Sequence, residues 1–222
     1  MVTVDRTLAR TAGSIAVAAG LIGASFGVFA RAAGVDPWLT CAMSVLVFAG
    51  GAQFLVVGLI SGGAAPLAAV AAALVLNARH LPFGLSLTNV LRGSFVRRAL
   101  SSHLMIDEST AFALAQPTPE QAQRAFLTMG IALFFAWNIG TAIGAFAAGA
   151  IGDPAALGID AAFPAGLLAM LAPQLHRPEA RAAAAGGAAL ALAATPVLPA
   201  GAPILIAGLG AAAGLAFASE RA

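Results

Sequence analysis

The chain has 222 residues, of which 60% are hydrophobic and only 9% are charged. A soluble domain is usually about a quarter charged, so a soluble fold of this length could not bury so much apolar side chain. All 11 basic residues are arginines, and they are scattered at apparent helix ends, which excludes a nucleic-acid-binding surface. The lone Cys41 and the absence of paired ligand motifs predict neither an intramolecular disulfide nor a metal site.

Seven apolar segments follow one another along the chain, and in lipid each must be helical to satisfy its own backbone groups. Their approximate bounds are 11–31, 38–60, 65–89, 121–149, 155–173, 182–198 and 200–219. A spanning helix needs roughly 20 apolar residues. The last two segments are short and fit either two spans or one broken hairpin. The first lacks a clear cleavage site, which indicates a retained span. The predicted fold class is an all-α polytopic membrane protein with about seven transmembrane helices.

Residues 91–118 interrupt this apolar pattern with a charged connector. Apolar residues at helical spacing alternate there with polar ones, which predicts an amphipathic helix at the membrane surface or a short helix tucked into the bundle. Thr118, Pro119 and Gln121 fit an N-cap, a first helical position and a capping-box partner. A new helix should therefore begin near residue 119.

An internal repeat joins the two halves of the chain. "GVFARAAGVDP" from Gly27 and "GAFAAGAIGDP" from Gly144 share Gly, Phe, two Ala and the final Asp-Pro. Two predicted spans lie between the repeats, so the first and fourth spans should run in opposite directions, as in the inverted repeats of secondary transporters. We therefore predict one membrane transport domain over 1–222. It would comprise a first repeat at about 11–90, the connector, a second repeat at about 119–198 and a final helix at about 200–219.

The arginine distribution bears on membrane orientation. With seven spans, it favours an outside N-terminus. In a rival arrangement residues 38–60 form a re-entrant hairpin, which brings Arg6 and Arg10 inside and makes the two repeats parallel. This rival arrangement is equally consistent with the distribution of arginines between the two sides of the membrane. We favour the inverted repeat.

The stretch "LVLNARHLPFG", residues 74–84, places Asn77, Arg79 and His80 in an apolar segment. An arginine at membrane depth costs about 2.5–3.5 kcal/mol on insertion scales. Pro82 removes a backbone hydrogen bond and would free the carbonyl of Ala78. The pattern predicts a broken helix whose polar groups face a cavity. Alternatively, Arg79 lies near the end of a short span.

A second polar interruption lies in "SVLVFAGGAQFLVVG", where Gly50 and Gly51 precede Gln53 and Ser44 lies upstream. The glycines allow a local break or a close helix contact. Gln53 either bonds to another helix, worth roughly 0.6 kcal/mol in a membrane, or contacts substrate. The uncharged amides of Gln53 and Asn77 would suit a zwitterion.

The acids offer partners for Arg79. Asp107 and Glu108 lie on the connector, just after His103. These two acids are compatible with three interpretations: a solvated surface helix, an ion pair, or a catalytic pair with His103 in a membrane enzyme. No serine elbow, zinc-ligand set or phosphate loop accompanies them, which disfavours the enzyme. Asp160 fits a helix cap or an ion pair. A buried acid or His80 could also carry a coupling proton.

Trp137 and Asn138 lie inside the fourth apolar segment. Asn138 needs a hydrogen-bond partner there. The pair predicts either an interhelical bond beside a packed tryptophan or a contact with substrate.

Several motifs in this order resemble the AzlC family, the large subunits of bacterial branched-chain amino-acid exporters. They are "SFGVFARAAGVDPW", "VFAGGAQF", "LNARHLPFG", "DES", "WNIGTAIGA" and "ALGIDAAFPAG", between about residues 20 and 175. The family motif positions in this sequence are Gln53, Asn77, Arg79, His80, Asp107, Glu108, Trp137 and Asp160.

The resemblance implies a multi-pass protein of the bacterial inner membrane that exports valine, leucine and isoleucine, and in some members methionine. It also implies a small AzlD-type membrane subunit as partner. No cofactor is expected, and a homo-oligomer is compatible with the sequence. The candidate substrate-binding residues are Gln53, Asn77, His80, Ser44, Trp137 and Asn138. The candidates for a coupling or structural ion pair are Arg79, Asp107, Glu108 and Asp160. A channel or a structural subunit without coupled transport is the alternative function.

Overall fold

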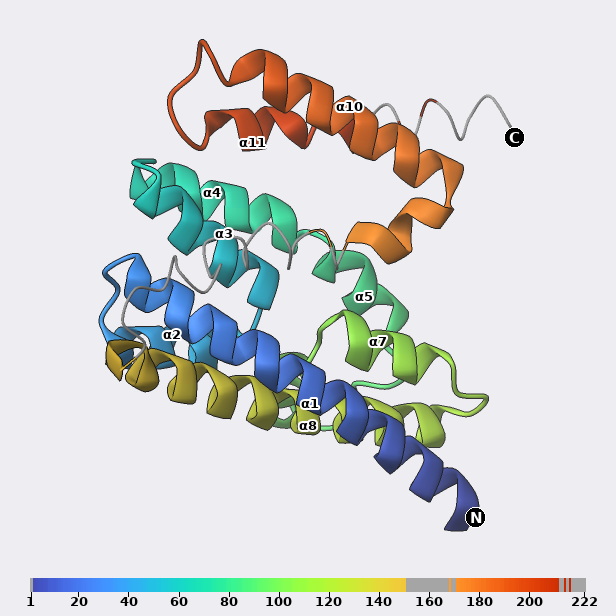
Figure 1. The fold of residues 1–222 in the computed structure, drawn as a ribbon. Coiled ribbons are helices and arrows are strands. Elements are labelled where there is room, and N and C mark those ends of the chain that lie inside the picture. Colours follow the sequence, from blue (N-terminus) through green and yellow to red (C-terminus); the bar gives the residue numbers. More distant parts are fainter. Residues whose placement is uncertain (1, 151–167, 169–170, 212–213, 215, 217–222) are drawn as a thin grey trace. The chain divides into compact units, whose positions relative to one another are not determined.

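The computed structural model describes residues 2–150, 168, 171–211, 214 and 216, and every regular element within them is a helix (Figure 1). An all-helical fold is therefore confirmed for this part of the chain. Asp160 and nearly all of the predicted segment 155–173 lie outside the described residues. The chain divides into two compact units, one formed by Met1–Gly50 with Ala78–Ile159 and the other by Gly51–Asn77 with Asp160–Ala222.

Unit 1 contains most of the long helices. Its elements are α1 (Val2–Ala32), α2 (Pro37–Val47), α5 (His80–Ser86), α6 (Phe95–Ser102), α7 (Asp107–Leu114), α8 (Pro119–Ala147) and the short 3₁₀ helix η1 (Ala148–Ala150). Unit 2 contains α3 (Gly50–Ser61) apart from its first residue, α4 (Pro66–Asn77), the 3₁₀ helix η4 (Ala172–His176), α10 (Pro178–Ala194) and α11 (Ala202–Ala207).

Two helix starts follow directly from local sequence. The Asp36 carboxylate accepts hydrogen bonds from the amides of Trp38 (2.8 Å) and Leu39 (3.2 Å), and Pro37 occupies the first helical position of α2. At α8, the Thr118 hydroxyl accepts from the amide of Gln121 at 3.3 Å. Both are ordinary N-caps, which satisfy backbone donors that a helix start leaves free. The predicted start near residue 119 is confirmed.

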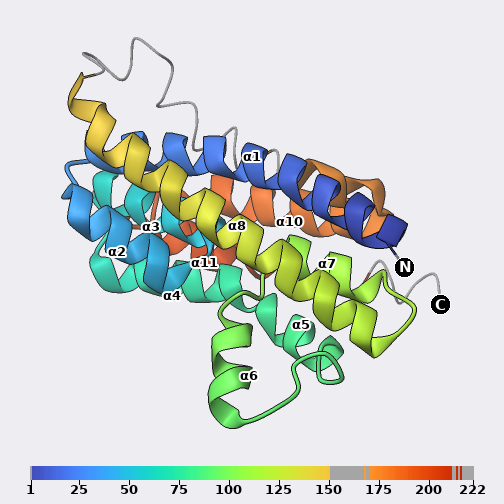
Figure 2. The ribbon, with the colours of Figure 1, turned by 90° about the horizontal axis from the view of Figure 1, so that it is seen from below.

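The helices α1 and α8 share the most extensive contact among the described elements, and they run parallel (Figures 1 and 2). Gly20 lies against Ala136 and Gly140, while Gly27 lies against Thr141 and Gly144. Residue numbers therefore increase in the same direction along both helices. Small residues allow this close approach of two backbones. The expected antiparallel relation between residues 11–31 and 121–149 is therefore wrong. The shared Asp-Pro motif carried no information on direction.

Three helices in the described residues are long and apolar enough to cross a membrane: Leu8–Ala32, Pro66–Ser86 and Pro119–Ala147. The predicted segment 38–60 is not one continuous helix, because α2 has 11 residues and α3 has 12. At 1.5 Å per residue, either alone is too short to cross about 30 Å of hydrocarbon. A count of seven spans stays a prediction.

The connector forms two short helices instead of one amphipathic helix. α6 is exposed along its length, whereas α7 buries Ser109, Thr110 and Ala113 and packs on α8. Ala113 joins Leu87 and Phe126 in a buried apolar cluster. The alternative of a short helix packed into the bundle is thus seen for α7.

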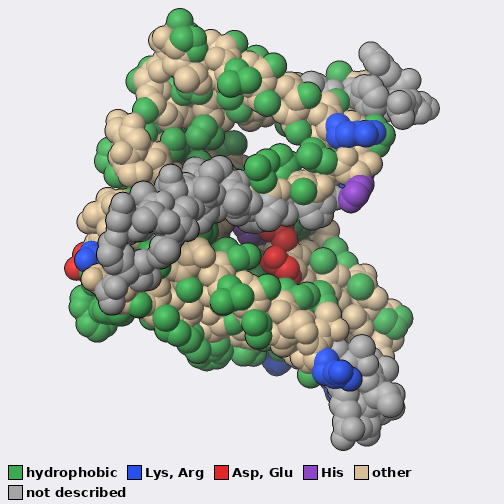
Figure 3. All heavy atoms as spheres, in the orientation of Figure 1, with side chains coloured by type: hydrophobic (Ala, Val, Ile, Leu, Met, Phe, Trp, Pro, Cys, Tyr) green, Lys and Arg blue, Asp and Glu red, His purple; other side chains and the backbone are tan. Residues whose placement is uncertain are grey.

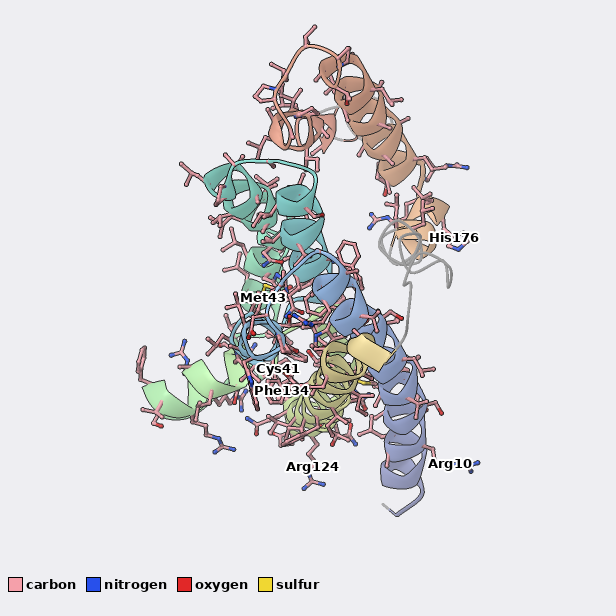
Figure 4. All side chains as sticks on the ribbon, turned by 60° about the vertical axis from the view of Figure 1, so that its left-hand side comes forward. Arg10, Cys41, Met43, Arg124, Phe134 and His176 are labelled. Carbon is pink, nitrogen blue, oxygen red and sulfur yellow. The ribbon has the colours of Figure 1, made fainter. Side chains whose placement is uncertain are left out.

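Large apolar side chains remain on the outer surfaces of the long helices. Leu21 of α1 is 68% exposed and Ile139 of α8 is 57% exposed, and Figure 3 shows hydrophobic side chains spread over the visible face. Charged side chains lie near helix ends, and Arg10 and Arg124 point away from α1 and α8 in Figure 4. Such a surface suits lipid as solvent, because lipid imposes no penalty on exposed apolar groups.

In unit 2, α11 packs against α10 and α4. Gly187 of α10 lies close to the Ala207 carbonyl of α11. α10 begins four residues before the predicted start at 182, since Pro178 occupies its first turn. Of the predicted segment 200–219, α11 covers six residues.

Candidate functional site

The predicted break near Asn77–His80 is present in the structure. α4 ends at Asn77 and α5 begins at His80, with Ala78 and Arg79 as turn residues between them. The expected free carbonyl at Ala78 is absent, because it accepts a hydrogen bond from the Leu81 amide at 3.0 Å. A tightened turn of this kind satisfies a carbonyl whose regular donor is missing, here the nitrogen of Pro82.

Arg79 projects from this break onto the start of α7. Its guanidinium Nη1 lies 2.9 Å from a carboxylate oxygen of Asp107, and the two side chains are 28% and 35% exposed. Its buried Nε has no hydrogen-bond partner among the described residues. Arg79 lies two residues after the end of α4 and seven residues before Ser86, the end of the candidate span. A partly desolvated ion pair therefore ties the break in one helix to the next short helix.

The first turn of α7 is held in place by Ser109. Its hydroxyl accepts from the Ile106 amide at 3.0 Å and donates to the Leu104 carbonyl at 2.7 Å. Asp107 and Glu108 at this helix start also benefit from the helix dipole. Ser109 positions this turn. It was not predicted from the sequence, although it is the last residue of the "DES" motif.

Glu108 lies outside the candidate spans and close to the ion pair. The residue as a whole is exposed, but surrounding protein desolvates its carboxylate and raises its pKa above the ordinary value. A backbone hydrogen bond and the Arg79 charge lower the pKa, and the Asp107 charge raises it. The desolvation is the largest of these effects, so Glu108 holds a proton more readily than an exposed glutamate does.

A second break separates α2 from α3, at Phe48 and Ala49. Phe48 has the left-handed conformation (φ 41°, ψ 47°), which is rare for a residue with a side chain. Its amide donates to the Ser44 carbonyl at 3.2 Å. Its ring packs edge-on against Phe134 of α8, with centroids 5.0 Å apart. The sequence placed this break at Gly50–Gly51, two residues later.

His103 closes the end of α2. Its Nε2 lies 2.8 Å from the carbonyl oxygen of Val45, so Nε2 carries the proton and donates. Carbonyls in the last turn of a helix have no partner within the helix, and His103 supplies one. Within the described residues His103 forms no ion pair with an acid. The catalytic pairing of His103 with Asp107 or Glu108 is therefore not seen.

Polar side chains are buried next to this second break. Ser44 is fully buried, and its hydroxyl donates to that of Thr141 on α8 at 3.3 Å. Trp137, one turn earlier on α8, stacks on Phe26 with ring centroids 6.1 Å apart. A Cβ on Gly50 would come within 2.6 Å of the Trp137 ring. Thr141 was missed from the sequence, although "WNIGTAIGA" contains it.

The remaining candidates occupy different places. Asn138 donates to the Phe134 carbonyl of its own helix at 2.8 Å, instead of making the expected interhelical bond. His80 is half buried and meets Phe83 edge-on. Gln53 is buried in α3 and Asn77 is the last residue of α4, both in unit 2. A common cavity for these residues stays a prediction. The described residues contain no group of three or more His, Cys, Asp or Glu that could hold a metal.

Long apolar helices, together with two helix interruptions beside buried polar and charged groups, define a helical integral membrane protein. The AzlC protein family profile matches residues 14–151, more than half of the chain, and the chain therefore belongs to the AzlC family.

Individual relatives agree with this class. The chain is 27% identical over 125 residues to the branched-chain amino acid transport protein AzlC of Bacillus subtilis, covering 55% of this chain and 49% of the relative. It thus spans about half the length of that protein. It is 30% identical over 170 residues to an uncharacterized membrane protein of Archaeoglobus fulgidus, covering 74% and 73% of the two chains. A membrane protein of Helicobacter pylori is 26% identical over 126 residues. No solved structure matches the chain.

Proposed function

We propose that this chain is a secondary transporter that exports the branched-chain amino acids valine, leucine and isoleucine across the bacterial inner membrane with a small partner subunit. The B. subtilis relative is named for branched-chain amino acid transport, which supports the substrate class. The observation that carries the proposal is the pair of helix interruptions at Phe48–Ala49 and Ala78–Arg79. Interrupted helices at membrane depth line a cavity or a protein interior, and in secondary transporters they bind the substrate.

The interruptions suggest how a zwitterion would be bound. The side-chain amides of Gln53 and Asn77 can offer both donors and acceptors to an ammonium and a carboxylate. Ser44, His80, Trp137 and Asn138 are the further candidates for contact, and apolar helix faces would receive the aliphatic side chain. The two compact units would work together as one transport domain.

The charged residues have a different proposed role. Arg79 and Asp107 would fix the position of the break, since a paired arginine is stable at a depth where a lone one is not. Glu108 is the candidate for a coupling proton because burial raises its pKa above the ordinary value of a glutamate. Asp160, outside the described residues, remains a candidate partner for Arg79.

Counterflow in proteoliposomes tests this function. Vesicles loaded with unlabelled leucine should accumulate labelled leucine from outside when they contain the chain, and valine should compete while lysine should not. Reconstitution with the small AzlD-type subunit should raise the rate. Absence of counterflow in both preparations would contradict the proposal. A channel would instead give flux that dissipates without accumulation and is insensitive to a proton gradient.

A further inference from the structure

The helix α6 stands apart from the rest of unit 1. It makes no extensive contact with another described helix, and it extends across the direction of α8 instead of along it (Figures 2 and 4). Phe95, Val96 and Leu100 are 84%, 64% and 69% exposed. A helix that extends across a membrane span can lie along the surface of the bilayer.

The two sides of α6 differ sharply in chemistry. At 100° per residue, Phe95, Val96, Ala99 and Leu100 fall on one half of the helix. Arg97, Arg98, Ser101 and Ser102 fall on the other half. Basic residues opposite large apolar ones are the pattern of helices that lie in the headgroup region of a membrane. The hydroxyl of Ser94 caps the helix by accepting from the Arg97 amide at 3.4 Å.

The attachment of α6 to α8 fixes its depth. Leu104, just after α6, packs against Gly130 of α8. From Gly130 to Ala147, α8 has 18 residues (147 − 130 + 1), about 27 Å of helix at 1.5 Å per residue. This length matches the hydrocarbon thickness of about 30 Å. Residues of α8 before Gly130 include Glu120 and Arg124. A hydrocarbon layer over Gly130–Ala147, within the candidate span Pro119–Ala147, would place the exit of α6 at its edge.

The arginines of α6 form no ion pair with any described residue. Residues 91–106 contain no acid. Arginine forms strong, bidentate hydrogen bonds with phosphate oxygens. We propose that α6 inserts its apolar face into one leaflet and binds the phosphate groups of anionic phospholipids through Arg97 and Arg98. This inference does not depend on the transported substrate.

Spin labels on the full-length protein test the insertion. In a Cys41→Ser background, labels at Leu100→Cys and Ser101→Cys are compared in vesicles of phosphatidylcholine, with and without phosphatidylglycerol. The label at position 100 should collide with oxygen and be shielded from a water-soluble nickel chelate, and the label at position 101 should show the reverse. Exposure of position 100 to nickel in both lipids would overturn the proposal. So would protection from both reagents, which indicates a protein partner or a second copy.

Lipid retention tests the role of the arginines. Because each basic residue near an anionic surface contributes about fivefold in binding, the double variant Arg97→Gln/Arg98→Gln should bind phosphatidylglycerol about 25-fold more weakly in native mass spectrometry. The control variant Arg10→Gln/Arg181→Gln removes the same charge from exposed positions elsewhere and should retain the lipid. Equal retention by both double variants would overturn the assignment to α6.

Discussion

Gly144 of α8 lies directly against the backbone of Ala24 in α1, so that a Cβ at position 144 would overlap the Ala24 carbonyl. Gly140 makes the same kind of approach to Gly20, one turn earlier. Two parallel helices are thus joined by close backbone contacts at these glycines. This arrangement has consequences for stability and for membrane topology.

The first prediction concerns the contact itself. Gly144→Ala should lower the thermal midpoint of the purified protein, because the helices must separate to accept the methyl group, at a typical overpacking cost of about 1–3 kcal/mol. Gly13→Ala is the matched control, since nothing lies within 4 Å of a Cβ there and alanine is the better helix former. The thermal midpoint of the Gly13→Ala variant should stay unchanged or rise. Equal effects of the two substitutions would contradict this account of the contact.

The parallel packing also predicts the topology of residues 38–60. The candidate spans Leu8–Ala32, Pro66–Ser86 and Pro119–Ala147 follow one another. The first and third of these can be parallel only if residues 38–60 return to the side from which they started, as a re-entrant hairpin. Cysteines at Ala33 and Gly62, in a Cys41→Ser background, should both react with a membrane-impermeant maleimide from the same side. Labelling from opposite sides would indicate a full crossing.

The Arg79–Asp107 pair should stabilise the break between α4 and α5. Removal of one partner from a buried ion pair lowers the free energy of unfolding by about 3–5 kcal/mol. For an exposed ion pair the loss is less than about 1 kcal/mol. Because this pair is partly buried, Arg79→Gln should cost about 1–3 kcal/mol, measured as chemical unfolding in detergent.

Two controls accompany this prediction. The double variant Arg79→Gln/Asp107→Asn should recover most of the loss, as a coupled pair does. Arg177→Gln breaks the more exposed pair with Glu179 and should have little effect. Additive losses in the double variant would show that the two residues act independently.

Glu108 should make stability depend on pH. Burial raises its pKa in the folded protein, so the folded state holds this proton more tightly than the unfolded state. The associated stability is fully present below the unfolded pKa of about 4.3, and it is lost as the pH rises through the folded pKa. Glu108→Gln should flatten this part of the curve of unfolding free energy against pH. An unchanged curve would exclude Glu108 as its source.

The amide candidates can be tested for substrate binding. Gln53→Ala and Asn77→Ala should abolish leucine counterflow while the protein still inserts and purifies as a folded species. Gln121→Ala and Asn89→Ala remove exposed amides and should preserve counterflow. Normal counterflow in both Gln53 and Asn77 variants would remove these residues from the proposed site.

Structural features that depend on neighbouring residues were predictable from the sequence. The start of α8 follows from Thr118 and Pro119, and the break after Asn77 follows from Pro82. The acids that could pair with Arg79 were also identifiable, because an arginine in an apolar segment requires compensation.

Features that depend on distant segments were not predictable. His103 and Val45 are 58 residues apart, and no local pattern marks a backbone carbonyl as an acceptor. The direction of α8 relative to α1 was predicted wrongly, because it depends on how residues 38–60 cross the membrane. The burial of Thr141 likewise depends on where α2 packs.

The two helix interruptions have different origins. Pro82 lies within the chain segment that it breaks, so that interruption is encoded locally. At Phe48, by contrast, a left-handed residue with a side chain costs about 1–2 kcal/mol and is held by the Phe134 and His103 rings. Gly50 and Gly51 weaken the helix nearby but do not carry the unusual conformation. The break at Phe48 is thus a property of the assembled bundle, which makes it the more adjustable joint of the two.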